Sequence, residues 1–265
     1  MKNVLLLVHD DTGQEARLQV ALDIVRAIRG HLICLDLTIF PVMAETYHAA
    51  TGVPLAEQRK RATAHRYRIE DRLALEGLSW HWVEDTGKFA LCLKDTVALA
   101  DLIVVNRKLR SFPVANMRGA AGEIILQSGT PLIAVPEVAR SLDMFGDVLI
   151  AWDGSQEAIA ALRAAVPLLK MARQVTILEI ADGSVRVSGD EAAAYLSSQN
   201  INAMSRIKHR RLDSTASEIL RETVLRSPTY VGMGGYAHGR LKDARLGVCT
   251  RRMLTESPVP VFLAH

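Results

Sequence analysis

Short apolar runs alternate with segments of helical periodicity along the chain. The runs at residues 3–8, 101–105 and 131–135 are apolar at almost every position, which is the pattern of strands buried on both faces of a parallel sheet. After the first run, apolar residues recur at helical spacing, at Leu18, Ala21, Leu22, Val25 and Ile28. Strands that alternate with helices in this way predict the α/β class.

The same pattern occurs a second time. The corresponding segments are 3–8 and 147–152, 101–105 and 229–233, and 131–135 and 260–264. A second set of apolar residues at helical spacing follows residue 152, at Ala158, Leu162, Ala165, Val166 and Leu169. An internal repeat on this scale predicts two copies of one structural unit.

Each copy is predicted to contain five strands. The remaining strands are expected at 31–37, 79–83, 174–180 and 204–210. With right-handed crossovers, each copy becomes an open, doubly wound parallel sheet of Rossmann-like type, which binds ligands at the carboxyl ends of its strands. We therefore predict two tandem domains, residues 1–140 and 145–265.

Two helix starts and one long segment complete the predicted architecture. Thr12-Gly13-Gln14-Glu15 and Thr215-Ala216-Ser217-Glu218 have the spacing of a capping box, so a helix is expected to begin at each. The charged segment 41–77 predicts helices and a loop, which either close over the site of the first copy or only cover its sheet.

Composition argues against several functional classes. The 265 residues carry 32 basic and 29 acidic side chains, and this near balance argues against nucleic acid as a partner. Cys34, Cys92 and Cys249 are widely spaced, so neither a disulfide framework nor a thiol metal site is indicated. No apolar run approaches the ~18 residues that span a bilayer, and the run after Met1 is too short for a signal peptide. We expect a cytoplasmic protein without a membrane or nucleic-acid partner.

Two glycine-containing turns are the candidate binding elements. Asp153-Gly154-Ser155 follows the apolar run 147–152 and opens a helix, where free backbone N–H groups favour an anionic group. The second turn begins at Gly234-Gly235, where missing side chains let a ligand approach the backbone. Asp153 either contacts that ligand or only caps the helix. Side by side, the two turns predict a nucleotide-sized crevice.

These residues resemble the universal stress protein family in its bacterial tandem-domain form. The resemblance rests on residues 151–155, 233–242 and 246–251, and it covers most of residues 145–265. The family's nucleotide signature is a glycine, two residues, a glycine, nine residues, and a glycine followed by Ser, Thr or another small residue. In this chain the four positions are, in order, Gly234, Ala237, Gly247 and Val248, so the second and the fourth depart from the signature.

The resemblance implies the fold of the adenine nucleotide alpha hydrolases and an adenine nucleotide, ATP or AMP with or without Mg²⁺, in the second domain. It implies that Asp153 lies at the nucleoside and that the backbone of Ile180 meets the adenine edge. The start of the last helix would meet the phosphates, where His238 on the preceding loop either contacts phosphate or is simply solvated. The implied binding residues are Asp153, Gly154, Ser155, Ile180, Gly234, Ala237, His238, Gly247, Val248, Cys249 and Thr250.

The first copy lacks most of these features. Asp10 or Asp11 would stand where Asp153 does, and its second turn contains no glycine before Gly119. We expect this copy to be a structural partner with a degenerate nucleotide site. Family members pair through their last strands, so 132–135 and 259–264 are expected to associate, either within the chain as a pseudo-dimer or between chains as a homodimer.

The resemblance implies regulation rather than catalysis, with weak ATPase activity at most. Related families that cleave ATP between its α- and β-phosphates carry a Ser-Gly-Gly loop and a His-x-Gly-His motif, and this chain has neither. The departures at Ala237 and Val248 keep a second hypothesis open, in which the protein binds no nucleotide. It would then be a scaffold that acts through dimerisation and partner contacts.

Overall fold

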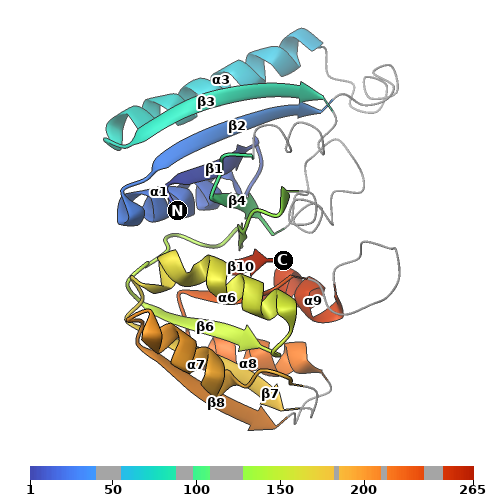
Figure 1. Cartoon of the computed structure of the whole chain (residues 1–265). Coiled ribbons are helices and arrows are strands. Elements are labelled where there is room, and N and C mark those ends of the chain that lie inside the picture. Colours follow the sequence, from blue (N-terminus) through green and yellow to red (C-terminus); the bar gives the residue numbers. More distant parts are fainter. Residues whose placement is uncertain (40–54, 88–97, 108–127, 182–184, 210–213, 236–246) are drawn as a thin grey trace.

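A computed structural model gives the architecture of the protein (Figure 1). It describes residues 1–39, 55–87, 98–107, 128–181, 185–209, 214–235 and 247–265. In these residues ten strands form a single sheet with helices packed on it. The predicted α/β class is confirmed, and so are the two sets of five strands.

The first half of the chain supplies five strands and two of the helices. The strands are β1 (Asn3–Val8), β2 (His31–Ile39), β3 (Ser79–Gly87), β4 (Leu102–Asn106) and β5 (Leu132–Val135), and the helices are α1 (Gln14–Ile28) and α3 (Leu55–Leu75). Strand β1 shows why the apolar runs are continuous. Leu6 packs into one apolar cluster and Leu5 into another on the opposite face, and both are fully buried.

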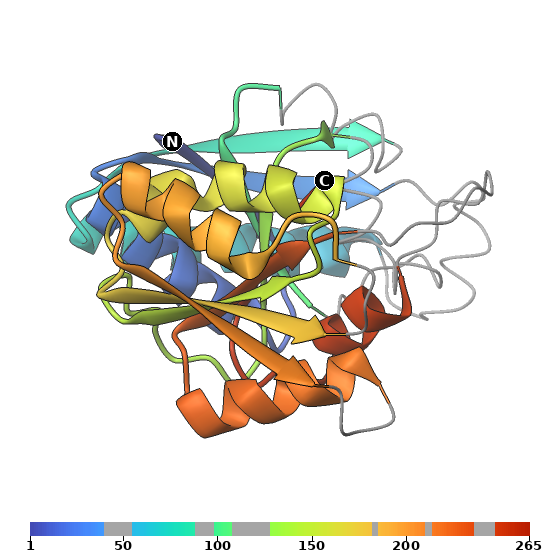
Figure 2. The same cartoon turned by 60° about the horizontal axis from the view of Figure 1, so that its bottom comes forward.

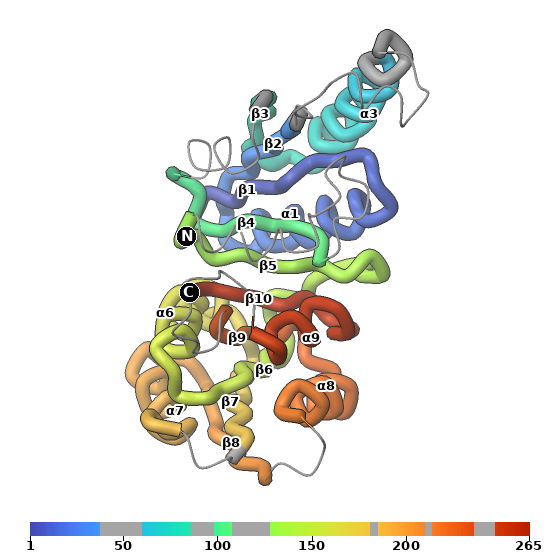
Figure 3. The backbone as a smooth tube through the Cα atoms, turned by 90° about the vertical axis from the view of Figure 1, so that its right-hand side faces the viewer, coloured from blue at the N-terminus to red at the C-terminus, as the bar shows by residue number. Residues whose placement is uncertain are grey.

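The second half repeats this arrangement, and four of its helices lie in the described ranges. Its elements are β6 (Asp147–Trp152), α6 (Gln156–Leu169), β7 (Gln174–Ala181), α7 (Gly189–Ser198), β8 (Ala203–His209), α8 (Thr215–Arg226), β9 (Tyr230–Gly234), α9 (Val248–Glu256) and β10 (Val261–Ala264). Helices α6 and α7 cover one face of the strands, and α8 and α9 cover the other (Figure 3). None of the helices in the described ranges is both long and apolar enough to cross a bilayer.

The two halves join through their last strands. The strand order is β3-β2-β1-β4-β5-β10-β9-β6-β7-β8, in which every described pairing is parallel except that of β5 with β10. Those two strands run antiparallel, with Ile133 opposite Phe262, and both residues are fully buried. The association of residues 132–135 with 259–264 therefore takes place inside one polypeptide, as a pseudo-dimer.

The twist of the sheet brings the carboxyl ends of the outer strands to one side of the molecule. Neighbouring strands rotate by about 20°, so nine steps across the sheet add up to roughly half a turn. This rotation offsets the antiparallel relation of the halves. The arrowheads of β2, β3, β7 and β8 accordingly point the same way in Figure 2, toward the side on which α9 begins.

The predicted capping boxes at Thr12 and Thr215 are wrong. Helix α1 has Gly13 at its N-cap, and its first turn is held instead by Asp11 Oδ1, which accepts the N–H of Gly13 at 2.9 Å. Helix α8 begins one residue earlier than predicted, because Ser214 Oγ accepts the N–H of Ser217 at 3.2 Å. A true capping box, missed in the sequence, joins Ser188 and Glu191 at the start of α7.

The described part of segment 41–77 packs against the sheet and α1. Helix α3 buries Ile69 and Leu73 in the same cluster as α1, and Arg66 stacks its guanidinium 5.3 Å from the centroid of the Trp82 ring. Arg72 Nη2 donates to Gln19 Oε1 at 2.7 Å. This helix covers the outer strands of the first half, while residues 41–54 lie outside the described ranges.

Candidate functional site

The turn after β6 places an exposed carboxylate at the carboxyl end of the second half. Asp153 Oδ1 accepts the N–H of Ser155 at 3.0 Å, and Ser155 Oγ accepts the N–H of Ala158 at 3.1 Å. Ser155 is therefore the N-cap of α6, and Asp153 tightens the turn before it. The helix cap, one of the two roles considered for Asp153, is therefore filled by Ser155.

Gly154 is required by the packing of this turn. Its φ is +68°, and a Cβ at this position would lie 2.6 Å from the carbonyl oxygen of Val187. That carbonyl accepts a hydrogen bond from Trp152 Nε1 at 2.8 Å. Positive φ and a fixed neighbouring backbone both exclude a side chain here. The missing side chain makes room for the segment before α7, a role that the sequence did not predict.

Gly234 has a similar structural role at the end of β9. A Cβ there would lie 2.7 Å from the backbone nitrogen of Ala158 and 2.8 Å from the carbonyl carbon of Glu157. The first turn of α6 thus rests directly on the strand end. In the described residues, the close approach that glycine allows at position 234 is made by the protein's own helix.

The start of α9 lies near Asp153. Burial raises the pKa of the Cys249 thiol to about 11, and the Asp153 carboxylate acts in the same direction, so the thiol is protonated at neutral pH. Gly247 is the N-cap of α9 and has no side chain to accept the first N–H groups. Val248 is 79% exposed, whereas Thr250 is buried. Asp153 therefore lies close enough to Cys249, in the first turn of α9, to act on it electrostatically.

The other predicted residues are placed less directly. Ile180 is buried near the end of β7, with its side chain in the apolar cluster under α8 and α9. Ala237 and His238 lie outside the described residues, as do the nearby cations Arg240 and Lys242. In the described ranges, no three His, Cys, Asp or Glu side chains are grouped as metal ligands would be.

Comparisons with known proteins connect this geometry with a fold. No protein-family model and no curated protein matches the chain. A universal stress protein from Archaeoglobus fulgidus matches it with a TM-score of 0.75 and 17% identity, over 99% of this chain and 97% of that one. This chain has the tandem universal stress protein fold. A functionally unknown protein from Pseudomonas aeruginosa is also similar, with a TM-score of 0.63 and 15% identity over 100% of this chain and 92% of that one.

The first copy of the universal stress protein fold has both of its strand-end carboxylates paired. Arg17 is fully buried, and its Nη1 lies 3.1 Å from each carboxylate oxygen of Asp11. Asp10 lies 3.5 Å from Arg68 Nη2 and 3.8 Å from His65 Nε2, both on α3. The two candidates for the role of Asp153 are thus held by cations of the chain itself.

Asn106 fills the other side of the same strand end. It ends β4 where Gly234 ends β9 in the second copy, it is 1% exposed, and its Nδ2 donates to Asp11 Oδ1 at 3.3 Å. One signal in the sequence was overlooked, because Arg17 lies in a helix between buried positions such as Ala16 and Leu18. A cation on the buried face of a helix indicates a buried partner. In the first copy, the side chains of Arg17, Asp11 and Asn106 therefore pack together at the ends of β1 and β4.

Proposed function

We propose that this chain is a cytoplasmic universal stress protein that binds one adenine nucleotide, ATP or AMP, in its second half. The role is regulatory, with slow turnover at most. The supporting observation is the meeting of Asp153 with the start of α9, where the carboxylate influences the Cys249 thiol. A ligand with a hydroxylated sugar and an anionic phosphate would use both groups, the sugar at Asp153 and the phosphate at the helix.

The start of α9 is suited to phosphate in three respects. Its cap residue Gly247 provides no acceptor, its first turn carries no acidic residue, and its first residue, Val248, is exposed. The backbone N–H groups of a first helical turn and the helix dipole both favour an anion in such a place. Ala237 enters the proposal only through the family signature, and His238 only through its place in the sequence before α9. Mg²⁺ would accompany the phosphates rather than a protein ligand cluster.

We propose that the first half does not bind nucleotide. Asp11 is neutralised by Arg17, and Asn106 stands against the same carboxylate. A nucleotide would have to displace a buried ion pair, and separating such a pair leaves an uncompensated charge. The first half then serves as the partner against which β10 pairs, and the expected stoichiometry is one nucleotide per chain.

Calorimetric titration with ATP and AMP, with and without Mg²⁺, tests the proposal. We expect one site per chain. Before the titration, a separate sample of the purified protein is denatured and tested for nucleotide that copurified with it. Asp153→Asn should weaken binding about tenfold or more, since it removes a charge-assisted contact. Gly247→Val should also weaken binding, because the branched side chain of valine would crowd the phosphate at the start of α9. Asp190→Asn is the matched control, because Asp190 is an exposed aspartate in the first turn of α7.

A second candidate function is supported by the packing of the two glycines. Gly154 and Gly234 both have structural reasons for lacking a side chain, so neither needs a ligand to explain it. In this alternative the protein binds no nucleotide and acts as a scaffold through partner contacts. If the titration gives no heat of binding and no nucleotide copurifies with the protein, the scaffold function is favoured.

A further inference from the structure

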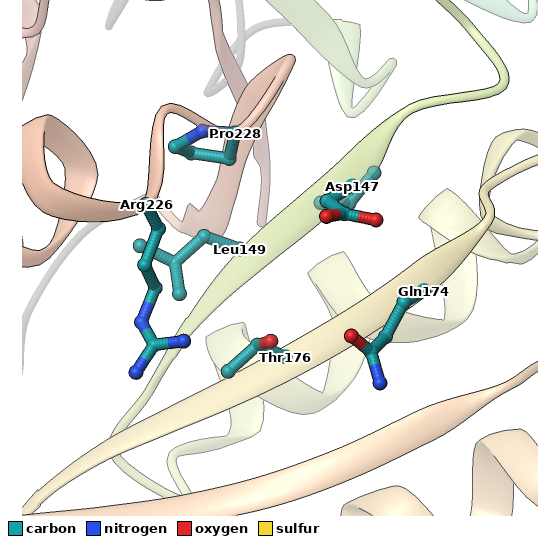
Figure 4. A pocket seen from close by; sticks show the side chains of 7 residues that line it. Asp147, Leu149, Gln174, Thr176, Arg226 and Pro228 are labelled. Atoms are coloured by element: carbon teal, nitrogen blue, oxygen red, sulfur yellow. The ribbon is translucent and has the colours of Figure 1, made fainter.

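A second concave site lies at the opposite end of the second half. Its cavity has a volume of about 200 Å³ at the amino ends of β6 and β7, whereas Asp153 follows the carboxyl end of β6 (Figure 4). The lining residues are Asp147, Val148, Leu149, Gln174, Thr176, Arg226 and Pro228. Sites for drug-sized ligands measure about 300–1,000 Å³, so this cavity is suited to a smaller metabolite and not to a nucleotide.

The floor of the cavity is a block of four side chains fixed by the register of the sheet. Asp147 is paired with Gln174, and Leu149 with Thr176, on the adjacent parallel strands β6 and β7. Alternate residues of a strand point to the same face, so all four lie on one face. Figure 4 shows Arg226 and Pro228 on one side, Asp147 and Gln174 on the other, and Thr176 between Arg226 and Gln174.

Arg226 is held at one nitrogen and open at two. Its Nε donates to Glu222 Oε2 at 3.0 Å, and Glu222 is 1% exposed. Glu222 also binds Lys208, which fixes the carboxylate from a second direction. Among the described residues, Nη1 and Nη2 of Arg226 have no acceptor, so the guanidinium is oriented while its outer edge remains available.

The other polar groups of the cavity are also unpaired within the described part of the chain. The Thr176 hydroxyl and the Gln174 amide make no side-chain hydrogen bond there. Asp147 receives two hydrogen bonds from Arg173, at 2.9 and 2.8 Å, and each carboxylate oxygen keeps a second lone pair. Donors therefore face the cavity from Arg226, Thr176 and Gln174, and an acceptor faces it from Asp147.

The charges favour an anion. Asp147 is balanced by Arg173, while the single carboxylate of Glu222 is shared by Lys208 and Arg226, which leaves one positive charge in excess. A planar guanidinium edge beside a hydroxyl matches a carboxylate. Leu149 and Pro228 supply an apolar wall for a short alkyl group.

We propose that this cavity binds a small carboxylic acid that carries a hydroxyl or amino group. Its carboxylate lies on Arg226 and Thr176, and its hydroxyl or ammonium group donates to Asp147. The site is separate from the proposed nucleotide site and does not depend on it. A metabolite sensor on the same half as a nucleotide site would give this protein two inputs.

Saturation-transfer NMR and calorimetry with defined probes test the proposal on the full chain. The probes are L-lactate and L-alanine, with propanoate lacking the donor group and propylamine lacking the carboxylate. We expect lactate, alanine or both to bind at millimolar concentration, propanoate to bind about tenfold more weakly, and propylamine not to bind. Binding of lactate alone identifies a hydroxy acid as the ligand class, and binding of alanine alone identifies an amino acid.

Variants separate the site from non-specific binding. Thr176→Val and Arg226→Lys should each weaken the bound probe about tenfold. Arg221→Lys is the control, because Arg221 lies on the same helix and does not line the cavity. Thr176→Val is nearly isosteric, so it decides the question if Arg226→Lys does not fold. The proposal is overturned if neither acid binds, if propylamine binds as well as the acid that does bind, or if affinity is unchanged in Thr176→Val.

Discussion

Arg17 and Asp11 form a buried ion pair at the carboxyl end of β1, with Nη1 and Oδ2 3.1 Å apart. At the corresponding end of β6, Asp153 is exposed and its carboxylate binds only the turn that follows, among the described residues. This difference separates the halves of an otherwise repeated structure. It supports the assignment of the single proposed nucleotide to the second half.

Arg17→Met should destabilise the protein strongly. The substitution leaves Asp11 buried without its cation, and the loss of one partner of a buried pair costs about 3–5 kcal/mol. Urea denaturation followed by circular dichroism measures the effect. Arg163→Met, at an exposed position of α6, should change stability by less than about 0.5 kcal/mol. Equal losses in the two variants would show that the Arg17 pair is unimportant.

Gly154→Ala should cost more stability than Gly77→Ala. The two glycines have similar φ values, +68° and +64°, so alanine meets a similar backbone strain of about 1–2 kcal/mol at each. Only at Gly154 would the Cβ also collide with the backbone of Val187, since nothing lies within 4 Å at Gly77. Thermal unfolding compares the pair, and an equal shift in midpoint would contradict the packing role of Gly154.

Asp36→Asn should stabilise the protein at neutral pH. Burial, with a contribution from Glu84, raises the pKa of Asp36 from 3.8 to about 6 in the folded protein. The native state therefore binds this proton more tightly than the unfolded state. The associated stability is fully present below about pH 4 and is lost as the pH rises through about 6. The loss is at most about 3 kcal/mol, because one pKa unit corresponds to about 1.4 kcal/mol.

The pH profile of the variant checks the sign. Asparagine does not titrate, so the stability difference between Asp36→Asn and the parent should grow between pH 4 and pH 6 and then level off. Glu137→Gln serves as a control, because Glu137 follows β5, which lies away from β2 in the sheet. A difference that is constant across this range would mean that Asp36 keeps an ordinary pKa in the folded protein.

Tyr230→Phe should leave stability unchanged or increase it. Tyr230 is fully buried, and its hydroxyl has no hydrogen-bond partner among the described residues. Burial raises the pKa of this hydroxyl. An unsatisfied buried hydroxyl costs about 1–3 kcal/mol, and phenylalanine removes it. Tyr67→Phe, at a position 61% exposed, should have no effect. A clear loss in Tyr230→Phe would reveal a hydrogen bond to this hydroxyl.

The strands could be predicted from the sequence because their burial is continuous. Residues such as Leu5 and Leu6 face opposite apolar clusters, so no polar position interrupts the run. The repeat then set the strand count, and the pairing of β5 with β10 followed from the family resemblance, whereas its antiparallel direction was found only in the structure. The caps were harder, since Ser214 and Thr215 both have suitable side chains and only backbone geometry selects Ser214.

The candidate site was only partly predictable. The sequence places Asp153 before a helix, but it does not show that Ser155 is the residue that caps it. Gly234 suggested room for a ligand and Gly154 was assigned to the binding turn, whereas in the structure the start of α6 packs against Gly234 and Val187 packs against Gly154. Those contacts join residues that are distant in the chain, so they cannot be predicted from local sequence patterns.

A crystal structure of the protein grown with AMP or with ATP and Mg²⁺ tests the central claim most directly. The account predicts one nucleotide per chain, with its phosphates at the first turn of α9, its sugar beside Asp153 and its base near Ile180. The Arg17–Asp11 pair should remain intact in the same crystal. A nucleotide bound in the first half, or an empty second half at a saturating concentration, would contradict the account.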